Sequence, residues 1–174
     1  MGVGQELRGD DAAGVLVIRR LIELTSASAR INFANSRTQT EQTESRPREE
    51  PLLFEAGPLP ESAAGPLRRY QPDWVVLIDA ADMGEAAGAI RWLDPLQVED
   101  FSGSTHAVPL GGFANYLSSE LGCKVAVLGI QSKSLEFDSP VSDEVRRAIE
   151  EITTFLIRES AEKALPTGDP IPRR

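Results

Sequence analysis

The sequence has very little of two residue types that often carry chemistry or hold small proteins together. It contains one cysteine and one histidine among 174 residues, Cys123 and His106. A single cysteine can form neither a disulfide within the chain nor a cysteine-rich metal site. A single histidine limits the metal-binding and acid–base chemistry that is available. Only one imidazole can therefore contribute to any site in this chain.

Positive charge and long apolar runs are also scarce. The chain has 18 Lys and Arg against 27 Asp and Glu, with a net charge of −9 and a pI near 4.7. We expect no nucleic-acid partner, because binding to phosphates needs a basic surface. No apolar run approaches the roughly 18 residues of a membrane span, and the N-terminus lacks the pattern of a secretion signal. We therefore expect a cytoplasmic protein with no membrane partner.

What the chain does contain is the pattern of an α/β domain. Two runs of mostly β-branched residues, 74–79 and 124–131, are typical of strands buried on both faces of a sheet. Apolar residues at helical spacing predict helices at 12–24 and after Ser142. Ser142 is expected to cap the second of these helices, and Phe155 and Leu156 are expected to be on the side of that helix that faces the core. Further expected elements are strands at 31–33, 52–55 and 88–94, and helices at 61–70 (interrupted at Gly65-Pro66) and around 113–121. Gly122 is expected to end the last of these helices in a left-handed conformation. This alternation predicts a three-layer α/β sandwich, a mostly parallel twisted sheet with helices on both faces.

The expected elements form a single domain over residues 1–163, a length that can bury a full core. Residues 35–50 are polar and show no periodicity, which indicates a surface loop inserted in this domain. The tail at 164–174 contains Pro and Gly, and we expect it to be disordered.

An acid follows the most apolar strand. Asp79 comes directly after five apolar residues, Trp74 to Ile78. In open α/β sheets, ligands bind beyond the carboxyl ends of the strands. An Asp at this position can also cap the next loop, but Asp82 is better placed for that role. Asp79 is therefore the first candidate for a functional residue.

Two other polar stretches could meet Asp79. The acids Asp10 and Asp11 precede the first expected helix, where both could cap it, or one could cap it while the other points into a cleft. His106 lies in a small polar loop that has no apolar face to pack. The sequence therefore favours a functional role for it and a structural role equally.

Several familiar kinds of site are disfavoured. In the Gly-rich opening, Leu7 stands where a dinucleotide fingerprint has its third glycine, and no P-loop Lys-Ser/Thr follows. Ser104 and Thr105 are too close to His106 along the chain for a Ser-His-Asp arrangement, and no G-x-S-x-G elbow exists. Cys123, at the start of an expected strand, is expected to be structural.

The residues that remain are Asp11, Asp79 and His106, two carboxylates and one imidazole from three separate loops. This ligand set suits a borderline divalent ion such as nickel or zinc, with coordination positions left open for other ligands.

Five motifs, taken in order, resemble those of the nickel–iron hydrogenase maturation endopeptidases. They are the Gly-rich opening through Gly-Asp-Asp at 2–14, Gly-Pro-Leu-Pro-Glu at 57–61, Ile-Asp-Ala-Ala-Asp-Met-Gly at 78–84, Ser-Thr-His at 104–106 and Leu-Gly-Ile-Gln at 128–131. Each motif is weak alone, whereas the ordered set is specific. The third and fifth motifs are most similar to those of the hydrogenase-3 type.

The resemblance implies an endopeptidase that removes a C-terminal extension from the hydrogenase large-subunit precursor after nickel insertion. The family's metal-recognising residues fall on Asp11, Asp79 and His106, and the two aspartates are also the catalytic candidates. Nickel is expected to arrive with the precursor, with no resident organic cofactor. A water activated by an aspartate or by the metal would attack the scissile bond, and which carboxylate is the base stays open. Glu55, where the family usually has Asp, is a candidate to assist.

The chain departs from the family at its start. Members begin with an apolar strand that leads into Gly-x-Gly, whereas Met1 opens directly on that loop. We therefore expect residues 1–9 to form a loop and the first strand to be missing from this chain. Gln5 and Ala12 replace the usual Asn and Gly. The alternative interpretation is a non-catalytic or degenerate nickel-site assembly chaperone, and a more remote one is a generic metal-dependent hydrolase.

Overall fold

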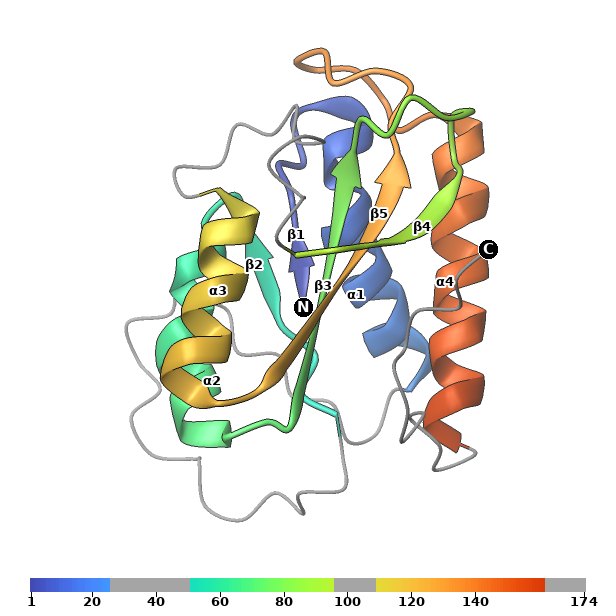
Figure 1. Ribbon diagram of the computed structural model, residues 1–174. Helices are drawn as coiled ribbons and strands as arrows, with labels where there is room; N and C mark the ends of the chain where they lie inside the picture. Colours follow the sequence, from blue (N-terminus) through green and yellow to red (C-terminus); the bar gives the residue numbers. More distant parts are fainter. Residues whose placement is uncertain (26–50, 96–108, 162–174) are drawn as a thin grey trace.

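A computed structural model of the protein describes residues 1–25, 51–95 and 109–161 (Figure 1). Its elements, with η for a short 3₁₀ helix, are β1 (Gly2–Val3), η1 (Gly9–Ala12), α1 (Ala13–Leu24), β2 (Glu55–Gly57), η2 (Pro60–Ala63), α2 (Ala64–Tyr70), β3 (Trp74–Ala81), β4 (Ile90–Leu93), α3 (Leu110–Leu121), β5 (Lys124–Gln131) and α4 (Asp143–Ala161). The strands form one sheet in the order β2-β1-β3-β5-β4. Neighbouring strands are parallel except for β4, which pairs antiparallel with β5 at the edge.

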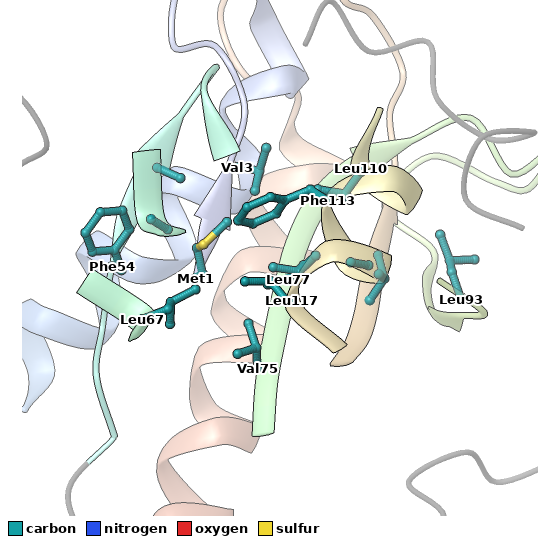
Figure 2. Packing of buried hydrophobic residues seen from close by; sticks show 14 of the residues in the cluster. Met1, Val3, Phe54, Leu67, Val75, Leu77, Leu93, Leu110, Phe113 and Leu117 are labelled. Atoms are coloured by element: carbon teal, nitrogen blue, oxygen red, sulfur yellow. The ribbon is translucent and has the colours of Figure 1, made fainter. Parts of the chain in front are cut away.

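Helices cover both faces of this sheet (Figure 1). On one face, α1 and α4 pack over apolar side chains that include Ile78 and Leu128. On the other face, α2 and α3 pack over a second cluster that includes Leu77 and Phe113 (Figure 2). Leu77 and Ile78 are consecutive and face opposite cores, as the alternation of side chains along a strand requires. The predicted three-layer α/β sandwich is confirmed.

The expected loop at residues 1–9 contains a strand, so that prediction was wrong at Gly2 and Val3. These residues pair in parallel with both β2 and β3. The Gly2 N–H donates to Phe54 O, and the Ile78 N–H donates to Met1 O, each at 2.9 Å. The first strand was expected to be missing, but the two-residue β1 is present and lies between β2 and β3. A strand of two residues is too short to show the alternating pattern by which strands are recognised in a sequence.

Most other expected elements are confirmed, with shifted bounds. The strand expected at 52–55 begins only at Glu55. The helix expected to break at Gly65-Pro66 runs through both residues, because Pro66 lies in the first turn of α2, where its missing N–H has no helical partner to lose. Gly122, at φ +66°, ends α3 in the predicted left-handed conformation.

One side chain of the last helix was assigned to the wrong face. Phe155 was expected to face the core of α4 but is 41% exposed. The buried stripe of α4 contains Val145, Ile149 and Ile152, and it continues to the partly buried Leu156. On a helix of 3.6 residues per turn this stripe leaves Phe155 at its margin.

Three expectations lie outside the described residues: the strand at 31–33, the polar loop at 35–50 and the tail at 164–174. Along the three described ranges, no helix is both long and apolar enough to cross a membrane.

Candidate active site

Asp79 lies near the carboxyl end of β3, in the middle of the sheet. It is 3% exposed, and its Oδ1 accepts a hydrogen bond from the Ala80 N–H at 2.9 Å. Because Leu77 and Ala81 belong to the cluster under α2 and α3, the alternation of β3 directs Asp79 toward that face. The predicted position of this acid is confirmed.

Asp11 lies in η1 and is 2% exposed. Its Oδ2 accepts a hydrogen bond from the backbone N–H of Gln5 at 3.0 Å. Gly4 makes this loop possible, since its φ is +132° and a Cβ there would overlap Asp11 O. The contact uses the main chain of Gln5, which explains why Gln is acceptable where the family usually has Asn.

Close packing brings the two acids to the same edge of the sheet. A Cβ at Gly14 would overlap the carbonyl oxygens of Val3 and Ile78, so α1 begins directly against β1 and β3. The preceding η1, which carries Asp11, contacts β3, which carries Asp79. Residues predicted from distant parts of the sequence therefore lie on neighbouring elements at the carboxyl edge.

The third predicted residue, His106, lies outside the described residues. Within the residues that are described, no three His, Cys, Asp or Glu side chains gather as a metal site. The set of Asp11, Asp79 and His106 therefore stays a prediction. Cys123 is buried and donates to Leu117 O at 3.5 Å, and burial raises the pKa of its thiol above the ordinary value.

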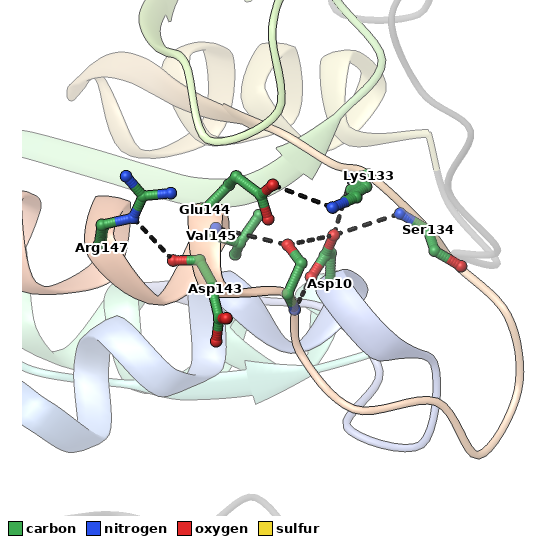
Figure 3. Close-up of polar contacts among 8 residues, drawn as sticks. Asp10, Lys133, Ser134, Asp143, Glu144, Val145 and Arg147 are labelled. Carbon is green, nitrogen blue, oxygen red and sulfur yellow. Dashed lines mark hydrogen bonds and ion pairs between the residues drawn. The ribbon is translucent and has the colours of Figure 1, made fainter.

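The neighbouring acids Asp10 and Asp11 have different surroundings. Asp10 is 1% exposed, and its carboxylate accepts the backbone N–H groups of Lys133 at 2.8 Å and Ser134 at 3.2 Å (Figure 3). It also accepts the backbone N–H of Ser142 at 2.7 Å and its hydroxyl at 3.0 Å. Asp10 thus attaches η1 to the loop between β5 and α4.

This network corrects one expectation. Neither acid caps the first helix, because η1 and α1 have no side-chain cap hydrogen bond. Asp10 binds instead at the start of α4, through Ser142. The predicted cap of α4 is confirmed, since Ser142 Oγ accepts the Val145 N–H at 3.4 Å.

Gln131 is a residue whose role sequence reasoning missed. Its Oε1 accepts the N–H groups of Met83 at 2.6 Å and Glu85 at 3.2 Å, and its Nε2 donates to Asp82 Oδ1 at 3.3 Å. The loop after β3 is therefore folded by the last residue of β5. The only signal in the sequence was that Gln131 ends the motif at 128–131. Asp82 also accepts the Gly84 N–H at 3.3 Å, which confirms its expected role in this loop.

Glu55 lies on the opposite face of the sheet from Asp79. It is 7% exposed, and its Oε2 accepts a hydrogen bond from Arg19 Nε on α1 at 3.0 Å. Arg19 also binds Glu6, with 2.6 Å between Nη2 and Oε1. The hydrogen bond from Arg19 lowers the pKa of Glu6, and Glu6 and Glu55 together raise the pKa of Arg19. Glu55 is thus an ion-pair partner of α1.

Two buried carboxylates lie at the carboxyl edge of a parallel sheet, where α/β enzymes bind their ligands, and carboxylates at such a place can hold a cation or activate a water. The profile of the HycI hydrogenase maturation protease family matches residues 39–159. The chain is 29% identical to the hydrogenase 3 maturation protease of Escherichia coli strain K12, over 86% of this chain and 82% of that protein.

Solved structures agree with this match. The crystal structure of the nickel–iron hydrogenase maturation protease HycI from Thermococcus kodakarensis KOD1 is 30% identical, with a TM-score of 0.70 over 92% of this chain and 89% of that one. The solution structure of the endopeptidase HycI from Escherichia coli is 23% identical and shares the fold, with a TM-score of 0.69 over 99% of this chain and 96% of that one. The chain belongs to the hydrogenase maturation protease family. It is an endopeptidase, a hydrolase of peptide bonds.

Proposed function

We propose that this endopeptidase removes a C-terminal extension from the nickel-loaded large-subunit precursor of a nickel–iron hydrogenase. The observation that carries the proposal is the pair Asp11 and Asp79, both buried at one edge of the sheet. The family match supplies the reaction class. The relatives named above are proteases or endopeptidases, which favours this function over the non-catalytic nickel-site chaperone.

The nickel belongs to the substrate in this proposal. Asp11, Asp79 and His106 would contact the precursor's nickel through its open coordination positions, since carboxylate and imidazole suit a borderline divalent ion. This contact would bring the scissile bond to the two carboxylates, where one of them, acting as a base, directs a water onto the carbonyl carbon. The elements around these carboxylates are fixed. Asp10 attaches η1 to the loop between β5 and α4, and Gly14 allows α1 to begin directly against the sheet.

We propose the cytoplasm as the place of the reaction, because a chain with a single cysteine has no internal disulfide that reducing conditions would break. The intact mass of a nickel-loaded precursor after incubation with the protein tests the proposal. Loss of a C-terminal peptide is expected with the wild type and not with nickel-free precursor. Asp79→Asn and Asp11→Asn are expected to reduce cleavage by at least about a hundredfold, the scale of a lost acid–base group.

A matched control is available on the same strand. Asp73 is exposed and lies just before the amino end of β3, at the edge opposite Asp79. Asp73→Asn is expected to cleave as the wild type does. A wild type that binds the precursor stably without any loss of mass would reject the protease and support the chaperone. Cleavage of nickel-free precursor at the same rate would reject the role of nickel.

A further inference from the structure

Exposed apolar residues lie on loops at the edge of the sheet that carries the candidate site. Five large apolar residues are exposed in the described ranges, and three of them lie on loops at one edge of the sheet. These three are Leu7, Leu59 and Phe137, which are 55%, 49% and 73% exposed. They follow β1, β2 and β5, whose parallel carboxyl ends meet at the edge that carries Asp11 and Asp79 (Figure 1). We call Leu7, Leu59 and Phe137 the apolar rim.

Backbone hydrogen bonds link the three loops that carry the apolar rim. The Asp138 N–H donates to Leu7 O at 2.8 Å, which holds Phe137 and Leu7 next to each other. The Gly4 N–H donates to Gly57 O at 3.0 Å, two residues before Leu59. The loops of Leu7 and Phe137 are therefore neighbours, and Leu59 follows the strand end that is bonded to Gly4, whereas a singly exposed apolar residue needs no explanation.

The loop that presents Phe137 is held in a defined shape. Ser139 Oγ donates to Glu136 O at 2.7 Å, and the Glu136 N–H donates to Ser134 Oγ at 3.3 Å. Asp138 has a φ of +58°, a left-handed conformation that Asp adopts more readily than most residues. A large aromatic side chain exposed to solvent contributes little to folding. On a loop whose backbone is already held in shape it binds a partner at a lower cost, because the loop itself loses little conformational entropy.

We propose that the apolar rim is the docking surface for the folded body of the precursor, next to the segment that is cut. The proposal rests on the proposed function and adds the surface that sets substrate affinity. Glu136 and Asp138 flank Phe137, both are exposed, and the whole chain carries a net charge of −9. The matching surface of the precursor is therefore an apolar patch bordered by basic residues.

The chain offers matched controls for this proposal. Phe137→Ser and Leu7→Ser alter the apolar rim. Phe155→Ser and Leu24→Ser alter residues on α4 and α1 that are 41% and 50% exposed and lie outside the rim. Circular dichroism and urea unfolding of all four variants establish that each is folded as the wild type is.

The experiment measures kcat and KM for cleavage of nickel-loaded precursor, together with the Kd of precursor binding by interferometry. Each rim variant is expected to raise KM and Kd about tenfold with kcat unchanged, the scale of a contact residue at a protein interface. Both control variants are expected to stay within about twofold of the wild type. In the wild type, added salt is expected to raise Kd, since the rim is flanked by charge.

The outcomes separate this proposal from the proposed function. If the wild type cleaves and the rim variants keep its KM and Kd, the docking surface is wrong and the proposed function stands. If no peptide is released but binding depends on the rim, the docking surface stands and the proposed function fails. Sedimentation that shows a dimer dissociated by Phe137→Ser, with Kd for the precursor unchanged, would assign the rim to a second copy of this chain and overturn the proposal.

Discussion

Asp10 and Ser142 are joined across 132 positions of the chain. The Ser142 backbone N–H donates to Asp10 Oδ1 at 2.7 Å, and its hydroxyl donates to Asp10 Oδ2 at 3.0 Å. The residue next to Asp10 is Asp11, so this contact fixes the short helix that presents a candidate catalytic acid. The first acid of the Gly-Asp-Asp motif thus positions the second.

Asp10→Ala is expected to lower the free energy of unfolding by about 3–5 kcal/mol, because three backbone N–H groups and one hydroxyl lose a charged acceptor in a buried place. Urea unfolding measures this loss. Ser142→Ala is the control, since it removes one hydroxyl and the cap of α4 and is expected to lower stability by only about 1–2 kcal/mol. Equal losses in the two variants would contradict the central role of Asp10.

Replacing either of two helical glycines by alanine is expected to change the stability of the protein, in opposite directions. At Gly14 in α1, a Cβ would overlap the carbonyl oxygens of Val3 and Ile78, so Gly14→Ala is expected to lower stability by about 1–3 kcal/mol or more. At Gly112 in α3, a Cβ would meet nothing within 4 Å, so Gly112→Ala is expected to raise stability by about 0.5–1 kcal/mol. Thermal unfolding of both variants measures the two shifts. A stabilised Gly14→Ala would show that α1 does not begin against the sheet.

The sequence predicted the parts of the fold whose signal is local. The apolar runs of β3 and β5 and the helical spacing of α1 and α4 are properties of consecutive residues, and their positions are confirmed. The position of Asp79 followed from the same signal, because it comes directly after such a run. The two-residue β1 carries no periodicity, and only its partners β2 and β3 make it a strand.

The roles of the polar residues depended on contacts that no local pattern contains. The partners of Asp10 lie 123 to 132 residues further along the chain, so capping was the only role that its neighbours indicated. Gln131 similarly acts on residues 46 and 48 positions earlier, in the loop after β3. Glu55 faces α1 because of the register of β2, which the sequence could not fix.

Arg19 is expected to be the residue that makes the buried carboxylate of Glu55 tolerable. Arg19→Met leaves Glu55 without its ion-pair partner, and we expect a loss of about 2–3 kcal/mol, less than for a fully buried pair because Arg19 retains contact with water.

Urea unfolding of Arg19→Met at pH 7 measures this loss. Glu6→Gln removes the exposed partner of the same arginine and is expected to change stability by about 1 kcal/mol or less. An Arg19→Met variant no less stable than Glu6→Gln would show that Glu55 needs no counter-charge.

In a chain whose first residue is Met1, the terminal amine is buried within the sheet and donates to Val76 O at 2.8 Å. Burial lowers the pKa of this amine from 8.0 to about 5. Between pH 5 and pH 8 the unfolded chain therefore binds a proton that the folded chain does not, so stability falls as the pH is lowered through this range. The total change corresponds to about 4 kcal/mol at about 1.4 kcal/mol per pH unit. Urea unfolding of His106→Gln isolates the effect, because His106 is the only histidine, and a flat profile would exclude a buried charge-sensitive amine.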